Sequence, residues 1–164
     1  RTVTGVQTCA LPIFTVECVS GCSSATYAST GIMEGVDEVQ AGTYVTMDRQ
    51  YHRLIPEFDI ALSILVSVIS IPKSGKAILD MGVKGAGGEF GVPMLRDYPN
   101  TEVPFFLSEE HTIINNAPDW RIGTKLHLIP SHACTTCNLY REMLVHDGSQ
   151  VIDIWPIEGS GKLA

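Results

Sequence analysis

Short runs of apolar and β-branched residues, each ended by turn-forming residues, constrain the fold of this chain more than any other feature. Such runs are typical of β-strands, and after residue 59 we predict strands at residues 60–71, 77–81, 103–107, 125–129, 143–146 and 151–155. His146-Asp147-Gly148-Ser149 predicts a β-hairpin, because Asp-Gly favours a tight turn between strands. No apolar pattern of helical period extends over four turns. We therefore expect a mainly β protein with a C-terminal β-barrel or sandwich domain.

The stretch between residues 14 and 47 has a different organisation. We predict extended segments at residues 14–19, 36–40 and 43–47, with a short helical turn near 28–34. Small residues follow the first two segments: Gly21, Cys22, Ser23 and Ser24, then Gly42 and Thr43. Backbone N–H groups and hydroxyls in such loops can bind a phosphate, although most small-residue loops are only turns. Two loops at the ends of successive strands are similar to the closing phosphate site of a TIM barrel.

The first 13 residues stand apart from the rest. Val3-Thr4-Gly5-Val6-Gln7-Thr8-Cys9-Ala10-Leu11-Pro12-Ile13 resembles the in-frame translation of a sequencing-adapter oligonucleotide. We therefore expect residues 1–13 not to be native sequence, and segments that did not evolve with a protein carry no information about its fold. The expected organisation is the end of a barrel in residues 14–47 and a β-domain in residues 48–164, with the true N-terminus upstream.

Composition excludes several classes of function. The net charge of −7 argues against nucleic acid as a partner, because binding phosphates requires a surplus of Lys and Arg. The longest apolar stretch, residues 60–71, contains three serines and is shorter than the roughly 20 residues that span a bilayer. Five cysteines without a regular framework do not indicate a disulfide scaffold. We expect a cytoplasmic protein of one ordinary core, with no membrane or nucleic-acid partner.

His132-Ala133-Cys134-Thr135-Thr136-Cys137 places three soft metal ligands within six residues. Imidazole and thiolate both bind zinc well. On extended backbone, residues i and i+2 point to the same side, so we expect His132 and Cys134 to share one ion while Ala133 faces away. Cys137 could join only if the chain turns. A buried histidine beside two apolar cysteines, a four-ligand structural zinc that adds Cys18 and Cys22, and thiol–disulfide chemistry remain alternatives.

Six motifs, in order over about residues 14–162, resemble the C-terminal part of the D-serine dehydratase and D-threonine aldolase family, relatives of the fold-type III alanine racemases. They are Val19-Ser20-Gly21-Cys22-Ser23-Ser24-Ala25-Thr26, Glu38-Val39-Gln40-Ala41-Gly42-Thr43-Tyr44, Leu79-Asp80-Met81-Gly82-Val83-Lys84, Ser108-Glu109-Glu110-His111, Pro130-Ser131-His132-Ala133-Cys134 and Asn138-Leu139-Tyr140. Cys22 stands where the family has glycine, Ala25 where it has proline, and Thr112 where it often has glycine. These departures affect the subfamily more than the family.

The resemblance implies cofactors and a reaction. The loops of Gly21–Ser24 and of Gly42, Thr43 and Tyr44 would bind the phosphate of pyridoxal 5'-phosphate (PLP), and His132 and Cys134 would hold a divalent metal. His-x-Cys is the dehydratase pattern and favours zinc, whereas the aldolases usually carry His-x-Asp. The Schiff-base lysine belongs to the family's N-terminal barrel, so we expect this chain by itself to be an inactive fragment of an enzyme.

The expected whole protein is a lyase acting on a D-3-hydroxy-amino acid and forming a homodimer. D-serine dehydration to pyruvate and ammonia is the first interpretation, and cleavage of D-threonine to glycine and acetaldehyde is the second. A non-catalytic β-domain, with or without a structural zinc, is the third. His111 is expected to be structural rather than a group that orients a ligand.

Overall fold

The computed structural model describes residues 16–104 and 108–162. The segment resembling an adapter translation therefore lies outside the described residues, as does most of the predicted strand 103–107. The chain divides into two compact units, with the boundary between Gly42 and Thr43. Each unit is described by itself.

The first unit contains a pair of short parallel strands. Strand β1 (Ser20–Gly21) pairs with β2 (Glu38–Val39), with Ser20 opposite Glu38. Between them lie a 3-10 turn, η1 (Ser24–Thr26), and a one-turn helix, α2 (Tyr27–Thr30). Parallel strands need a crossover connection, which the turn and the helix provide here. The pairing confirms the extended segment at residues 36–40 in part.

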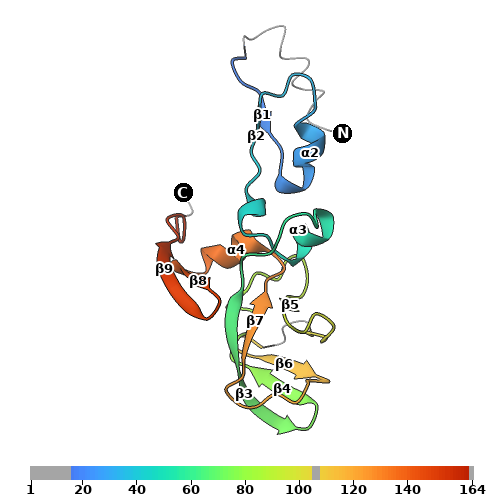
Figure 1. Cartoon of the computed structure of the whole chain (residues 1–164), viewed down its shortest axis with the longest axis vertical. Helices are drawn as coiled ribbons and strands as arrows, with labels where there is room; N and C mark the ends of the chain where they lie inside the picture. Colours follow the sequence, from blue (N-terminus) through green and yellow to red (C-terminus); the bar gives the residue numbers. More distant parts are fainter. Residues whose placement is uncertain (1–15, 105–107, 163–164) are drawn as a thin grey trace. The chain divides into compact units, whose positions relative to one another are not determined.

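The second unit is built on a five-stranded antiparallel sheet in the order β5-β7-β3-β4-β6. Its strands are β3 (Ile64–Lys73), β4 (Lys76–Leu79), β5 (Met94–Leu95), β6 (Thr112–Asn115) and β7 (Lys125–Ile129). The first part of β3, Ile64 to Ser67, pairs with β7, and its second part pairs with β4 across two register shifts. Irregularities of this kind bend a strand, so the sheet curls into a half-barrel (Figure 1). The prediction of a mainly β domain is confirmed, and in place of the expected barrel or sandwich the sheet forms a curled half-barrel.

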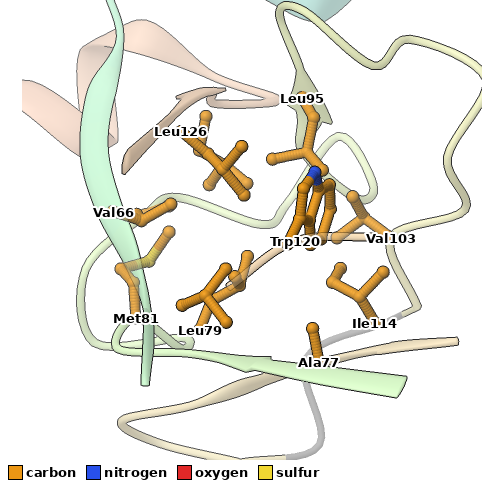
Figure 2. Close-up of a cluster of buried hydrophobic side chains, with 12 residues drawn as sticks. Val66, Ala77, Leu79, Met81, Leu95, Val103, Ile114, Trp120 and Leu126 are labelled. Atoms are coloured by element: carbon orange, nitrogen blue, oxygen red, sulfur yellow. The ribbon is translucent and has the colours of Figure 1, made fainter. Parts of the chain in front are cut away.

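The concave side of this sheet holds the core. Val66 and Val68 alternate with more exposed residues along β3, as expected for a strand with one buried face. They pack with Leu79 of β4, Ile114 of β6 and Leu128 of β7. Figure 2 shows Trp120 lying between Leu95, Val103 and Ile114, and its indole ring also meets Tyr98 edge to face at 5.1 Å between centroids. One apolar cluster therefore joins all five strands.

Short helices and a hairpin complete the second unit. Thr43–Val45 forms the 3-10 turn η2, and the helix α3 (Arg49–Leu54) follows it. A second short helix, α4 (Ala133–Asn138), comes after β7. Strands β8 (Glu142–Asp147) and β9 (Gln150–Pro156) form a separate two-stranded antiparallel sheet. Along this hairpin the apolar side chains of Leu144, Val151, Ile152, Ile154 and Trp155 are exposed.

The sequence predicts most of these strands but not all of the elements. The prediction at residues 125–129 coincides with β7, and those at 77–81, 143–146 and 151–155 are confirmed with small changes at their ends. Residues 60–63 are not strand, and the strand predicted at 43–47 is wrong, since those residues form η2 and the loop after it. The two-residue β5 and the four-residue β6 are absent from the prediction, because they are too short to show an alternating pattern.

No helix in the described part of the chain is long and apolar enough to cross a membrane.

Gly82 allows the turn at residues 82–85 to approach the backbone of Ser108 and Glu109 closely. Val83 and Lys84 donate backbone hydrogen bonds to the carbonyl oxygens of Ser108 and Glu109, at 3.3 and 3.1 Å. A methyl group on Gly82 would collide with the same carbonyl oxygens, whereas one on Gly159 would meet nothing within 4 Å. The turn at residues 82–85 therefore requires glycine at position 82.

We expect Gly82→Ala to lower the free energy of unfolding by about 1–3 kcal/mol, the usual cost of overpacking against backbone. Denaturant titration measures this change. Gly159→Ala is the matched control and should stay within about 0.5 kcal/mol of the unchanged protein. Equal stability of the two variants would contradict the close approach described here.

Candidate metal and cofactor site

His132 and Cys134 lie at the start of α4, where the chain changes from extended to helical backbone. His132 precedes the helix with φ −141° and ψ 119°, and Cys134 is the second residue of the helix. The prediction that both residues lie on extended backbone is therefore wrong for Cys134. Ala133 between them is buried, while the thiol-bearing Cys134 is exposed. The chain does turn, as Cys137 would need in order to join, but no described contact links Cys137 to His132.

The start of α4 is fixed by Asp48, a carboxylate that is completely buried. One of its oxygens accepts a hydrogen bond from the backbone N–H of Ala133 at 2.8 Å, and the other accepts from Tyr51 N–H at 2.7 Å. Asp48 is thus the N-cap of α3 and also satisfies the first helical N–H of α4. The backbone N–H of Arg49 donates to the carbonyl of Pro130 at 3.0 Å. These contacts hold the residues just before His132 against α3.

Glu89 contacts the imidazole of His132 directly. Glu89 Oε1 lies 2.8 Å from His132 Nδ1, and the Phe90 ring lies against the imidazole, with centroids 4.4 Å apart. Burial acts to raise the pKa of Glu89, but hydrogen bonds from Thr135 and His132 outweigh it and hold that pKa below its ordinary value. The carboxylate is therefore ionised at neutral pH, and an ionised carboxylate can only accept.

The Gly-rich turn that carries Glu89 is bound to α4 through its backbone. Gly87 N–H donates to Thr136 Oγ1 at 3.0 Å, and Ser131 Oγ donates to the Gly87 carbonyl at 2.8 Å. Thr136 Oγ1 in turn donates to the carbonyl of His132 at 2.6 Å. A side chain on Gly87 would collide with Thr135. The close contact between the turn and the helix therefore requires glycine at position 87.

Two of the residues predicted to bind cofactor also belong to this unit. Thr43 Oγ1 lies 4.0 Å from Cys134 Sγ, so the structure brings a predicted phosphate-loop residue beside a predicted metal ligand. The ring of Tyr44 lies 5.8 Å from that of Phe58, in a tilted arrangement. Thr43 and Tyr44 are in the 3-10 turn η2, so their backbone is not extended as expected.

The other predicted phosphate-binding residues lie in the first unit, in the loops that follow its two strands. Gly21 ends β1 and is followed by Cys22, Ser23 and Ser24, and Gly42 follows β2. Because β1 and β2 are parallel, both loops start at the same end of the strand pair. Cys22 has φ 86°, a left-handed conformation that favours glycine. A cysteine at this position, where the resemblance leads us to expect glycine, therefore adopts a backbone conformation that is unfavourable for it.

The cysteines and acidic residues do not form a structural metal site in the part of the chain that the structure describes. The described cysteines, Cys18, Cys22, Cys134 and Cys137, are free thiols. Among residues 16–104 and 108–162, no three His, Cys, Asp or Glu side chains are grouped so that they could hold an ion. A structural zinc requires four ligands and therefore has no support within these ranges.

Sequence reasoning misses Asp48, Glu89 and Phe90. Residues 85–88 predict only a turn, and Glu89 follows them without a recognisable motif. Lys84, in contrast, forms surface ion pairs with Glu109 at 2.6 Å and Glu110 at 2.9 Å. His111 is exposed beside them and makes no described contact with His132 or Cys134.

His132 and Cys134 therefore stand at the start of α4 in a curled antiparallel β-domain. Comparison with known proteins identifies the family of this domain. The family profile described as "Putative serine dehydratase domain" matches residues 61–146. The chain is 30% identical over 160 residues to 3-hydroxy-D-aspartate aldolase of Paracoccus denitrificans, covering 89% of this chain and 40% of that protein. It is 33% identical to D-threonine aldolase of Arthrobacter sp, covering 85% and 40%.

A solved structure agrees with these relatives. The crystal structure of D-threonine aldolase from Filomicrobium marinum superposes with a TM-score of 0.85 at 26% identity, covering 99% of this chain and 46% of that one. The chain therefore belongs to the D-threonine aldolase and D-serine dehydratase family of fold-type III PLP enzymes, as their C-terminal D-serine dehydratase-like domain. It spans about two fifths of the length of these two curated relatives.

We expect Asp48→Ala to lower the free energy of unfolding by about 2–5 kcal/mol, because it leaves a buried and a part-buried N–H donor without their acceptor. Denaturant titration is the measurement. Asp59→Ala removes an exposed carboxylate and should change stability by no more than about 0.5 kcal/mol. A loss of the same size in both variants would show that Asp48 does not join the two helices.

We expect Cys137 to be alkylated several-fold more slowly than Cys134 at mildly alkaline pH. Burial, followed by the neighbouring Cys134, raises the pKa of the Cys137 thiol, and the unreactive protonated form persists as the pH rises. Cys134 is also more exposed. Timed iodoacetamide labelling with peptide mass spectrometry gives both rates, and equal rates would contradict this expectation.

Proposed function

We propose that this chain carries the metal site of a PLP- and zinc-dependent lyase that acts on D-3-hydroxy-amino acids. The observation that carries the proposal is the pair of donors at the start of α4. His132 uses Nδ1 for Glu89, which leaves Nε2 for a metal, and the exposed Cys134 thiol is two residues away. Two protein ligands leave open positions, as in catalytic rather than structural zinc sites.

The donor set fits zinc better than harder ions. Imidazole and thiolate select zinc, whereas magnesium and manganese prefer oxygen ligands. When bound, zinc supplies Lewis-acid chemistry that stabilises negative charge on an oxygen. The contribution of this chain is to hold the two donors in place, through Asp48 at the helix start and Glu89 at the imidazole.

A related enzyme supports the same assignment. The chain is 29% identical to D-threo-3-hydroxyaspartate dehydratase of Delftia sp.. Structures of that enzyme include a histidine-to-alanine variant and a cysteine-to-alanine variant, two residues apart, of which the cysteine variant is described as metal-free. His132 and Cys134 have the same spacing.

The first-unit loops fit the phosphate of PLP. A side chain added at Gly21 or Gly42 would meet nothing within 4 Å, so there is space beside these loops. Backbone N–H groups in small-residue loops bind phosphate well. When bound, PLP supplies an electron sink for carbanion chemistry. Within this unit Ser23 is the side chain proposed for phosphate binding, because the side chain of Ser24 is buried. Thr43 and Tyr44 remain separate candidates in the second unit.

Dehydration is the reaction that we favour, because His-x-Cys resembles the dehydratase pattern. Aldol cleavage is the second candidate, favoured by the two aldolases among the relatives. Both reactions develop negative charge on the substrate's β-oxygen, which a Lewis acid stabilises in either case. The metal ligands alone therefore do not separate the two reactions.

We expect the whole protein to convert D-serine to pyruvate and ammonia faster than it converts D-threonine to glycine and acetaldehyde. Separate assays of pyruvate and acetaldehyde make the comparison. Faster release of acetaldehyde would replace the dehydratase by the aldolase, and the absence of turnover with either substrate would overturn both of these reactions.

His132→Ala should remove bound zinc and reduce activity about 100-fold or more, since a Lewis-acid contact is worth several kcal/mol. Elemental analysis gives the zinc content and a product assay gives the rate. His146→Ala is the matched control on an exposed histidine of the hairpin and should keep both. Full zinc content in His132→Ala would overturn the metal assignment.

A further inference from the structure

We infer that Glu89 is a positioning residue that holds His132 in the tautomer and ring orientation required to bind a metal through Nε2. This inference rests on the proposed function, because it concerns the same site. Its starting point is the 2.8 Å contact between Glu89 Oε1 and His132 Nδ1. The other contacts of Glu89 and His132 also hold the imidazole in place.

The chemistry of the contact fixes the proton on one ring nitrogen. A carboxylate is acceptor-only, so the donor in this hydrogen bond must be Nδ1–H. A neutral imidazole that carries its proton on Nδ1 has a lone pair on Nε2. Metal-ligating histidines usually donate their other ring N–H to a carboxylate or a carbonyl, which orients the ring and raises its basicity.

The surroundings limit how far the imidazole can rotate. The Phe90 ring lies against one side of it, with centroids 4.4 Å apart and planes inclined by 33°. The His132 side chain is 17% exposed and that of Glu89 is 40% exposed, so solvent screens this contact less than it screens the ion pairs of Lys84, which lie on the open surface. Phe90 and Glu89 are adjacent in the chain, so one turn determines both the plane of the His132 imidazole and the ring nitrogen that carries its proton.

Hydrogen bonds fix the turn that carries Glu89 against the helix that carries Cys134. The backbone of Gly87 exchanges hydrogen bonds with Ser131 and Thr136, on either side of His132 and Cys134. Glu89 is also hydrogen-bonded to Thr135. The orienting carboxylate and both proposed ligands therefore belong to one frame, and a displacement of the turn would change the direction of the imidazole relative to the thiol.

The test measures the tautomer of His132 and the affinity of the site for metal in the same variants. Glu89→Gln keeps the shape of the side chain, but its amide can either donate to or accept from Nδ1, and Glu89→Ala removes the contact. Glu158→Gln is the matched control, because Glu158 is exposed and lies only in a 3.8 Å pair with Lys162. All variants are made in the 164-residue chain and compared first by thermal unfolding.

Nitrogen-15 NMR of the imidazole, recorded without metal at a pH where His132 is neutral, should show the Nδ1–H form in the unchanged chain. The Nε2–H form should grow in Glu89→Gln and dominate in Glu89→Ala. Titration with Zn²⁺, and with Co²⁺ to follow the thiolate-to-cobalt absorption of Cys134, should show affinity about 10–100-fold lower in both Glu89 variants. Glu158→Gln should match the unchanged chain in both measurements.

Two results separate the failure of this inference from the failure of the proposed function. Zinc affinity in Glu89→Gln and Glu89→Ala equal to that of the unchanged chain, or an Nε2–H tautomer in the unchanged chain, would overturn the role of Glu89 and leave the metal site intact. If the unchanged chain binds neither Zn²⁺ nor Co²⁺, the proposed function fails, and the tautomer populations alone then decide whether Glu89 holds the ring. A purely structural Glu89 would lower the unfolding temperature without moving the tautomer.

Discussion

The site depends on one buried carboxylate. Asp48 accepts from the first turn of α3 and from the first residue of α4, Ala133, which is 85 residues from Asp48 in sequence. A buried polar group is costly unless it is hydrogen-bonded, and here the cost is offset by satisfying helix-end N–H groups that would otherwise lack partners. The direction in which the chain leaves Pro130, and therefore the positions of His132 and Cys134, follow from this contact.

Around Asp48, the site is held together mainly by hydrogen bonds that involve backbone groups. The Gly-rich turn approaches α4 closely because Gly87 has no side chain, and its N–H donates to the buried Thr136 of α4. Glu89 then reaches the imidazole, and Phe90 packs against it. The half-barrel has an apolar core that joins its five strands, and neither of the two proposed ligands lies on those strands.

Local signals in the sequence predict local features well. Lys125–Ile129 alternates clearly and is bounded by a glycine before it and a proline after it, so its strand can be predicted without knowledge of its neighbours. Asp147-Gly148 likewise predicts the β8–β9 hairpin, and the motif around His132 indicates the family. Glu89 and Asp48 cannot be predicted in this way, because each meets its partner across 43 or 85 residues and no spacing rule connects them. The helices α3 and α4, with six residues each, are too short to show a helical period.

The β8–β9 hairpin has a consequence for the handling of the protein in solution. Its two strands pair only with each other within the described residues, and apolar side chains such as Leu144, Ile154 and Trp155 remain in contact with water. Exposed strand edges with apolar faces act as templates for pairing with other chains. A net charge of −7 opposes that association by mutual repulsion. Salt screens surface charges, so the colloidal stability of the chain should decrease as ionic strength rises, although no contact within the fold changes.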